Sequence, residues 1–406
     1  MKLILRMALR NVFRNRRRSL LTGLMMAGGY ALFALTLGMS EGTYGSIIDM
    51  FTRSRTGHAQ VHADGYLEKP SLYKTIKDPA AAGTVLDGLD IVEAWAPRVY
   101  APVLAFAGAK TVGAQVMGLD PVRERRATRI ASQLASGSFV PEDTSAGAVI
   151  SARLASALAI GPGDEFSLIG QGADGSIAND NFTVAGVLSS SESAFDGPWC
   201  LMHIDKAGEF MALGGRAHEI ALVFTDYRDA RADAAAVNRA LAGRGLDAQP
   251  WQVTEKEFHQ AMLLDRKSGD ITNLIIMAIV AVGVLNTVLM AVLERTREYG
   301  LLKAMGTRPA AVFGLIMTEV LFLALMASAA GALVGAGLNH WLSVSGIPIP
   351  EPISYGGVKF THMLTAVTVE SFTRPLVTVL AAALIVGVFP ALKAARVTPV
   401  KALGSR

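Results

Sequence analysis

The sequence predicts a polytopic α-helical membrane protein with four transmembrane helices and a large mixed α/β extracytoplasmic domain between spans 1 and 2. Mean hydropathy is +0.37, and only 18% of the 406 residues are charged, against about 25% in typical soluble domains. Uncharged runs of membrane-spanning length recur along the chain. Residues 58–250, by contrast, contain short alternating and Ala-rich segments typical of an α/β domain.

Several chemistries find no support in these residues. The sequence contains no Gly-Lys dipeptide, so a phosphate-binding P-loop is excluded from it, and neither His-Glu-x-x-His nor Gly-x-Ser-x-Gly occurs. The single cysteine, Cys200, excludes an internal disulfide and a Cys-based zinc cluster. His58 and His62 would share a strand face, where we interpret them as solvated polar positions rather than metal ligands. We therefore expect no catalytic centre and no bound cofactor or metal.

The first segment, 1–18, carries seven basic residues and no acidic one. Arg6, Arg10 and Arg14 recur every four residues opposite apolar positions, which predicts an amphipathic helix on the cytoplasmic leaflet. Nucleic-acid binding is the alternative for this basic run and the net charge of +4. We disfavour it because an apolar run follows at once.

That apolar run predicts the first span, 19–42, with no charged residue from Leu20 to Ser40. Its length and the absence of an Ala-x-Ala-like site favour an uncleaved span over a signal peptide. Gly28 and Gly29 would let another helix approach closely, or are simply tolerated small residues. A stalk helix, 43–57, is expected to continue the span until Thr56-Gly57.

The periplasmic α/β domain is assigned to 58–250. Alternating residues predict strands over 58–62 and 182–187, and Ala-rich runs predict helices over 152–159 and 230–242. Asp174-Gly175 indicates a hairpin turn.

A second stalk helix, 251–270, is expected to continue into the second span, 271–293. Thr254 and Glu257 fit a capping box at its start. Gly269 is the weak point of this continuous helix, and a hinge there is the alternative.

The charged segment 294–309 separates the second and third spans. Glu294 with Arg297, and Arg295 with Glu298, are opposite charges spaced i,i+3 on a helix. Gly306 can end this helix in the left-handed conformation. We give equal weight to a rigid knob that transmits force or docks a partner and to a solvated loop that only connects two spans.

The third span, 310–338, begins near Pro309 and carries one charge, Glu319. A carboxylate at that depth costs about 2–3 kcal/mol and is normally buried against partners. A proton-relay or cargo-contacting residue is one interpretation; a protonated or hydrogen-bonded packing residue is the one we favour. Gly331, Gly335 and Gly337 form a small-residue face suited to close helix contact.

A periplasmic connector, 339–374, follows, with extended backbone expected because of its prolines. Trp341 and Tyr355 would lie at the membrane interface. The fourth span is assigned to 375–392, and the cytoplasmic tail to 393–406, with a short helix beginning near Thr398-Pro399.

Orientation follows from the lysines and arginines in the short flanks. Seven lie in the first 18 residues, four in 294–309 and four after Pro390, but only two in 339–374. Both termini and the 294–309 segment are therefore expected in the cytoplasm, in a bacterial inner membrane, with 58–250 outside.

Four segments resemble the type VII ABC permeases, the FtsX-like family that includes the lipoprotein-releasing permeases and MacB: ALRNVFRNRRRSLLT (8–22), ERTREYGLLKAMGTRPAAV (294–312), TEVLFLALMASAAGALVGAG (318–337) and FPALKAARVTPVKAL (389–403). In the outer domain, GHAQVHADGYLEKP (57–70) and VMGLDPVRE (116–124) are similar to segments of the lipoprotein-releasing permeases. MacB carries its own ATPase domain, and this sequence shows none.

The resemblance implies a subunit that pairs with a second permease, identical or paralogous, and with two separate ATPase subunits that bind ATP and Mg. Closure of the ATPases would tilt the stalks and move the outer domains, a mechanism called mechanotransmission. The residues that the resemblance assigns to ATPase coupling are Glu294, Arg295, Arg297, Glu298, Tyr299, Leu302, Lys303, Met305 and Gly306. Where Tyr299 stands, family members often have an aliphatic residue, so we expect a local packing change there.

Three functions follow from these expectations. The first is extraction or export of a hydrophobic cargo such as a lipoprotein, lipid or amphiphile, with a periplasmic acceptor or accessory protein as a further partner. The cargo-facing candidates in the first span are Met25, Gly28, Gly29 and Phe33. The second is a transmitter that transports nothing and activates a periplasmic cell-wall hydrolase, and the third is a peptide-sensing or resistance complex. The size of the outer domain favours the first over the second.

Overall fold

The computed structural model describes residues 16–189, 195, 197–355 and 358–398. The amphipathic helix expected before residue 16 and the short helix expected after Thr398 lie outside the described residues. The chain divides into two compact units. Unit 1 consists of 1–44, 262–348 and 362–406, and unit 2 of 45–261 and 349–361.

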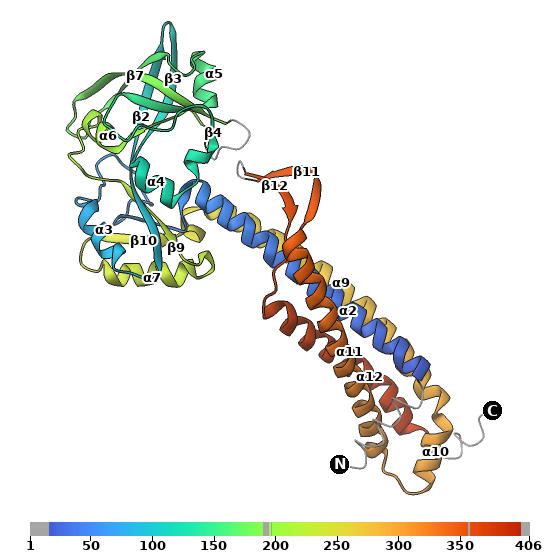
Figure 1. Cartoon of the computed structure of the whole chain (residues 1–406). Coiled ribbons are helices and arrows are strands. Elements are labelled where there is room, and N and C mark those ends of the chain that lie inside the picture. Colours follow the sequence, from blue (N-terminus) through green and yellow to red (C-terminus); the bar gives the residue numbers. More distant parts are fainter. Residues whose placement is uncertain (1–15, 190–194, 196, 356–357, 399–406) are drawn as a thin grey trace. The chain divides into compact units, whose positions relative to one another are not determined.

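Unit 1 is built from helices. Four of them in the described chain are long and apolar enough to cross a membrane: α2 (Arg16–Phe51), α9 (Lys256–Glu294), α11 (Pro309–Ser345) and α12 (Glu370–Arg396) (Figure 1). A short helix, α10 (Thr296–Ala304), lies between α9 and α11 in sequence. The four predicted spans are confirmed. Helices α2 and α9 also extend into unit 2, so each is longer than a span.

The helix that contains the third predicted span is longer than that span. Helix α11 continues to Ser345 instead of ending near Leu338, because no Gly or Pro interrupts residues 339–345 and Gly346, at φ +63°, ends it. Asn339 is fully buried and donates a hydrogen bond from Nδ2 to the Ala34 carbonyl of α2 at 3.0 Å. The expected extended backbone is confined to the hairpin of β11 (Ile347–Tyr355) and β12 (Val358–Met363).

Small residues bring the helices of unit 1 together. A Cβ on Gly29 would lie 2.4 Å from Val280 Cγ2 of α9, and one on Gly331 would lie 2.6 Å from the Ala27 carbonyl of α2. Both glycines therefore mark close helix contacts, as the small-residue pattern predicts. Gly28 and Gly337 have open space at the same position, so they are only tolerated.

For the second stalk helix, the structure corrects the predicted capping box and decides between a continuous helix and a hinge. Thr254 does not cap α9, because it ends the short helix α8 (Trp251–Thr254), and its Oγ1 is buried without a hydrogen-bond partner among the described residues. Helix α9 begins only at Lys256, after Glu255. Gly269 lies inside this unbroken helix, so the hinge is not present.

Unit 2 contains a ten-stranded sheet with short helices around it. The strands are β1 (Ala59–Ala63), β2 (Val92–Ala107), β3 (Lys110–Leu119), β4 (Leu134–Gly137), β5 (Gly147–Ser151), β6 (Glu165–Gln171), β7 (Ile177–Leu188), β8 (Trp199–His203), β9 (Glu219–Phe224) and β10 (Leu246–Pro250). The helices are α3 (Pro79–Asp87), α4 (Pro121–Ala127), α5 (Ala152–Leu158), α6 (Ile204–Phe210) and α7 (Ala230–Ala240). The helices predicted at 152–159 and 230–242, and the β6–β7 turn at Asp174-Gly175, are confirmed.

The pairing closes part of this sheet into a ring. Each strand pairs with the next in the order β2, β3, β8, β5, β7, β6. Strand β6 then pairs with β2, which closes the ring. Buried side chains from these strands, among them Val116, Ile150, Phe166, Phe182 and Cys200, form one apolar core. The first half of the long strand β2 pairs with β9, which continues the sheet through β1 to β10.

A buried ion cluster lies where β2 passes from one part of the sheet to the other. Arg98 is fully buried; its Nη1 donates to Glu219 Oε1 at 2.8 Å, and its Nη2 and Nε donate to the two carboxylate oxygens of Glu124 at 2.5 and 3.0 Å. The Thr128 hydroxyl donates to Glu124 at 2.5 Å. Burial of a charge requires such full pairing.

The expectation that His58 and His62 are solvated is wrong. They are only 1% and 3% exposed, because the rings of Phe224 and Tyr227 lie beside His58 and the ring of Tyr66 stacks on His62. His58 Nδ1 accepts a hydrogen bond from the Phe224 backbone N–H at 3.0 Å. His62 Nδ1 lies 3.0 Å from the His218 carbonyl. The described residues contain no group of three or more side chains suited to a metal ion.

Cys200 provides a direct probe of this core. It is fully buried inside the ring of strands, and this burial raises the pKa of its thiol well above the usual range. Because the thiolate is the reactive form, we expect maleimide to leave the folded chain unlabelled and to modify Cys200 only as unit 2 unfolds. Mass spectrometry along a urea series would measure this, and rapid labelling without denaturant would contradict it.

Candidate functional site

The segment 294–306 forms a short helix between two turns rather than one continuous helix. Helix α9 ends at Glu294, Arg295 leaves the helical conformation at φ −99° and ψ 13°, and α10 begins at Thr296. At the other end, Gly306 has φ +93°, and the Thr307 N–H donates to the Leu302 carbonyl at 3.0 Å. Gly306 thus takes the left-handed conformation that its residue type predicts.

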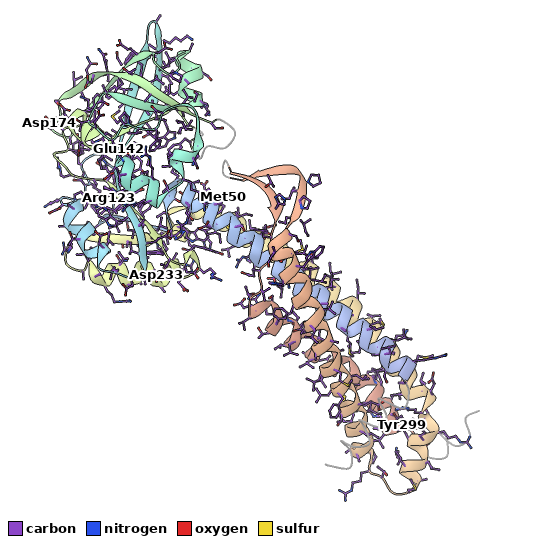
Figure 2. The ribbon with its side chains drawn as sticks, viewed as in Figure 1. Met50, Arg123, Glu142, Asp174, Asp233 and Tyr299 are labelled. Atoms are coloured by element: carbon purple, nitrogen blue, oxygen red, sulfur yellow. The ribbon has the colours of Figure 1, made fainter. Side chains whose placement is uncertain are left out.

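One face of α10 packs on the neighbouring helices. Tyr299 is 4% exposed and lies in a cluster with Val292 of α9, Val312 and Ile316 of α11, and Ala391 and Ala394 of α12. Figure 2 shows Tyr299 on this helix. Burial, followed by the charge of Glu319, raises the pKa of Tyr299 to about 12, so its hydroxyl stays neutral. Tyr299 therefore acts as a packing residue.

Lys303 ties α10 to the end of α12. Its Nζ donates hydrogen bonds to the Ala395 carbonyl at 2.8 Å and to the Val397 carbonyl at 2.6 Å. These belong to the carbonyls that the C-terminus of a helix leaves without intrahelical partners, where a cation is also favoured by the helix dipole. The bond joins residues far apart in the sequence, so α10 is held to the fourth span at this point.

Arg295 ties the start of α10 to α11. Its Nη1 donates to the Glu319 carboxylate at 3.0 and 3.3 Å, and the two side chains are only 6% and 16% exposed. Burial alone would lower the pKa of Arg295, but the charge of Glu319, the electrostatic interaction and hydrogen bond with Tyr299 and the charge of Glu298 together outweigh burial, so the pKa is raised. A cavity of about 40 Å³ adjoins the pair, with room for an ordered water. The Glu319 carboxylate is therefore ion-paired with Arg295.

The opposite face of α10 points away from the other helices. The exposed residues of the segment are Glu294, Arg297, Glu298, Leu301, Ala304, Met305 and Gly306. Leu301 and Met305 are 53% and 69% exposed, and Arg297, Leu301 and Met305 follow one another at i,i+4. Leu301 is missing from the residues that the resemblance assigns to coupling, although it lies on the same exposed stripe as Arg297 and Met305. Leu302 and Lys303 are half-buried.

The cargo-facing candidates of the first span do not share one surface. Met25 is 45% exposed, and Gly28 is also exposed. Gly29 is packed against Val280, and Phe33, at 8% exposure, lies in a cluster with Tyr30, Leu37 and Met277. Of these four candidates, only Met25 and Gly28 are exposed. The side chains of Leu21, Leu24 and Leu32 on the same helix are exposed as well.

Within unit 2, the ends of both long helices are held firmly. Phe51 at the end of α2 stacks on Phe258 of α9, with ring centroids 3.9 Å apart. The π-helix Thr52–Thr56 then leads to Gly57, and the Gln133 amide donates to the Ser54 carbonyl at 2.8 Å. Arg53 is paired with Glu93 at 2.6 Å. The sequence patterns indicated a stalk here, but none of these contacts.

Comparisons with known proteins agree with this architecture. Residues 19–241 match the MacB-like periplasmic core domain, and residues 271–399 match the FtsX-like permease C-terminal domain. The lipoprotein-releasing system transmembrane protein LolC of Neisseria meningitidis is 23% identical over 60% of this chain and 60% of its own length. The macrolide export ATP-binding/permease protein MacB of Syntrophobacter fumaroxidans is 32% identical over 32% of this chain and 16% of its own length.

The pyoverdine export ATP-binding/permease protein PvdT of Pseudomonas aeruginosa is 38% identical over 31% of this chain and 16% of its length. The chain thus spans less than two thirds of each of these relatives. The periplasmic region of MacB from Actinobacillus actinomycetemcomitans covers 51% of this chain, and the chain covers 95% of that structure, at 13% identity and a TM-score of 0.38.

Proposed function

Because this chain belongs to the FtsX-like ABC transporter permeases and carries their MacB-like periplasmic core domain, we propose that a separate ATPase subunit acts on the exposed face of α10. The observation that carries this proposal is the division of α10 into two faces. Tyr299, Lys303 and Arg295 anchor it to α9, α11 and α12. The exposed stripe of Arg297, Leu301 and Met305 is left for a partner.

The anchored face indicates how force would pass from the ATPase to the spans. A load on the exposed stripe reaches α12 through Lys303 and α11 through Arg295 and Glu319. Helices α2 and α9 are each unbroken from the membrane-spanning part into unit 2, where Phe51 and Phe258 join them. We propose mechanotransmission along these helices, in a complex of two permease subunits, identical or paralogous, and two ATPase subunits that hold ATP and Mg.

The proposed cargo is a hydrophobic molecule such as a lipoprotein, lipid or amphiphile, extracted or exported from a bacterial inner membrane. Exposed apolar residues of α2 support this choice, since Leu21, Leu24, Met25 and Leu32 are all more than one third exposed. Met25 and Gly28 are the residues that we retain as cargo-facing. The relatives named for lipoprotein release and for export of macrolides and pyoverdine act on different molecules.

The proposed orientation places α10 in the cytoplasm and residues 58–250 in the periplasm. The variants Leu301→Cys and Asp174→Cys, each of which adds one cysteine to the native Cys200, should then be labelled by an impermeant maleimide from opposite sides of the membrane. Both sites are exposed, and the buried Cys200 should stay silent. Labelling of both variants in intact spheroplasts would place them on one side and refute the mechanism.

Reversing the charges on the exposed face should uncouple the subunits. For Glu294→Lys with Arg297→Glu, we expect at least a tenfold loss of cargo-stimulated ATP turnover in the reconstituted complex, because both side chains are exposed to a partner while the anchors remain intact. Membrane insertion and thermal stability should not change.

The matched control is Lys393→Glu, an exposed charge change on α12. Full ATP turnover in the double variant would remove the coupling role from α10. In the wild-type complex, ATP turnover that cargo does not stimulate would instead favour a transmitter that activates a cell-wall hydrolase.

A further inference from the structure

A pocket of about 470 Å³ lies within unit 2, far along the chain from the coupling segment. Helices α3 and α4 and strand β2 form one wall, and α6 with the loop after it forms the other. The volume falls within the range of about 300–1,000 Å³ that is usual for small-molecule sites. The polar and aromatic residues that the argument uses are Asp87, Trp95, Arg123, Asp205, Glu209 and Arg216.

The floor of the pocket is a fixed aromatic ring. Trp95 is 6% exposed, and its indole Nε1 donates to Asp87 Oδ1 at 2.7 Å. Behind the ring, a Cβ on Gly83 would lie 2.0 Å from it, so α3 holds the indole closely. Pro79 and Pro97 line the pocket beside it. Because Trp95 itself is almost fully covered, the apolar surface offered to a planar or aliphatic group is that of the two prolines.

Two arginines supply positive charge to the pocket. The Arg123 guanidinium carbon lies 3.7 Å from the Trp95 ring centroid, and Figure 2 shows this residue in unit 2. Its Nε is 3.7 Å from Asp120, while its Nη groups have no hydrogen-bond partner among the described residues. Arg216 is held in place by its Nε, which donates to the Leu213 carbonyl at 2.7 Å. A stacked or braced guanidinium is well suited to a carboxylate or phosphate.

The loop after α6 adds bare backbone donors. Gly214 and Gly215 have φ of +59° and +80°, and in the described chain neither N–H donates a hydrogen bond. A Cβ at either position would meet no atom within 4 Å, so the backbone is open to a ligand. The acidic residues Asp205 and Glu209 are 71% and 75% exposed, and Glu209 is paired with Lys206 at 3.4 Å. They therefore lie at the solvent rim, and Asp87, the third carboxylate of the lining, accepts the hydrogen bond of the Trp95 indole.

We propose that this pocket binds an oxyanion carried on a small planar or aliphatic body. Arg123, Arg216 and the glycine N–H groups hold the anionic group, Trp95 keeps the Arg123 guanidinium in place beneath it, and the two prolines contact the body. A phosphate from a lipid headgroup and a carboxylate from an acidic amino acid share this chemistry. The pocket is independent of α10, so its test does not depend on the coupling proposal.

Fluorine NMR of the full chain tests the proposal. The chain has four tryptophans, so protein labelled with 5-fluorotryptophan in maltoside micelles should give four resonances, and Trp95→Phe identifies the one at the pocket. We expect sn-glycerol 3-phosphate or N-acetylaspartate to shift the Trp95 resonance to saturation while the other three stay constant. Binding of the first probe alone identifies a phosphate ligand, and binding of the second alone identifies an acidic amino acid.

Three variants distinguish binding of the probe in the pocket from unspecific effects of the probe on the protein. Arg123→Gln should weaken binding at least about tenfold, because it removes a hydrogen-bonded charge from the anion. Gly208→Leu should abolish binding by filling the pocket, since a Cβ there meets nothing within 4 Å. Arg125→Gln, on the same helix but paired with Glu142 at 2.6 Å outside the pocket, should bind normally. The absence of any Trp95 shift with both probes, or equal affinity in Arg123→Gln and the wild type, would overturn the proposal.

Discussion

Replacing Arg98 by Met is expected to destabilise unit 2 by about 3–5 kcal/mol. Arg98 is fully buried and is the cation that both Glu124 and Glu219 contact. Met fills a similar volume but leaves two carboxylates buried without their positive partner. The loss is large relative to a typical stability of 5–15 kcal/mol, so we expect much of the protein to be unfolded or degraded.

The Cys200 thiol measures this effect in the same unit. In Arg98→Met the urea concentration at which maleimide labels Cys200 should fall sharply, and the exposed Arg126→Met provides the matched control. The triple variant Arg98→Met, Glu124→Gln, Glu219→Gln should recover most of the loss, because it removes the unpaired charges. A labelling profile in Arg98→Met that equals the wild-type profile would show that the ion cluster is energetically unimportant.

Replacing Arg295 by Met is expected to have the largest effect in unit 1, with a cost of about 3 kcal/mol and a loss of coupled ATP turnover of at least tenfold. The change leaves the Glu319 carboxylate, 16% exposed, without its cation inside a membrane-spanning helix. It also removes the tie between the start of α10 and α11. The exposed neighbour Arg297→Met should leave stability unchanged.

A double-mutant cycle separates the two consequences. Glu319→Gln removes the unpaired carboxylate, so Arg295→Met with Glu319→Gln should regain thermal stability in nanodiscs but not coupling, since the tie between α10 and α11 is still missing. Recovery of both properties would show that the pair contributes only to stability. Purely additive losses in the cycle would show that the two residues do not interact.

The sequence was informative wherever one local property decides the structure. The spans follow from uncharged length, the end of α10 from Gly306, and several strands and helices of unit 2 from periodicity. Local patterns failed where a neighbour distant in sequence changed the outcome. His62 lies on a polar-looking strand, yet its Nδ1 lies 3.0 Å from the carbonyl of the distant residue His218 and its ring stacks on Tyr66.

The same limit applies to the coupling segment. Its charges suggested pairs within one helix, but Arg295 turns out of the helical conformation and contacts Glu319, and Lys303 contacts carbonyls at the end of α12. Charge spacing identifies residues that could pair on a helix, and it carries no information about partners on other helices.

By itself, the sequence determined that this chain has four membrane-spanning helices, an α/β domain after the first of them, and a charged segment between the second and third. These properties depend on hydropathy, periodicity and turn residues, which act over a few neighbouring positions. Only the tertiary structure decided which face of α10 is anchored and which is exposed, and that Arg98 neutralises Glu124 and Glu219. Those contacts join residues far apart in the chain, so they form only when the helices and strands that carry these residues pack together.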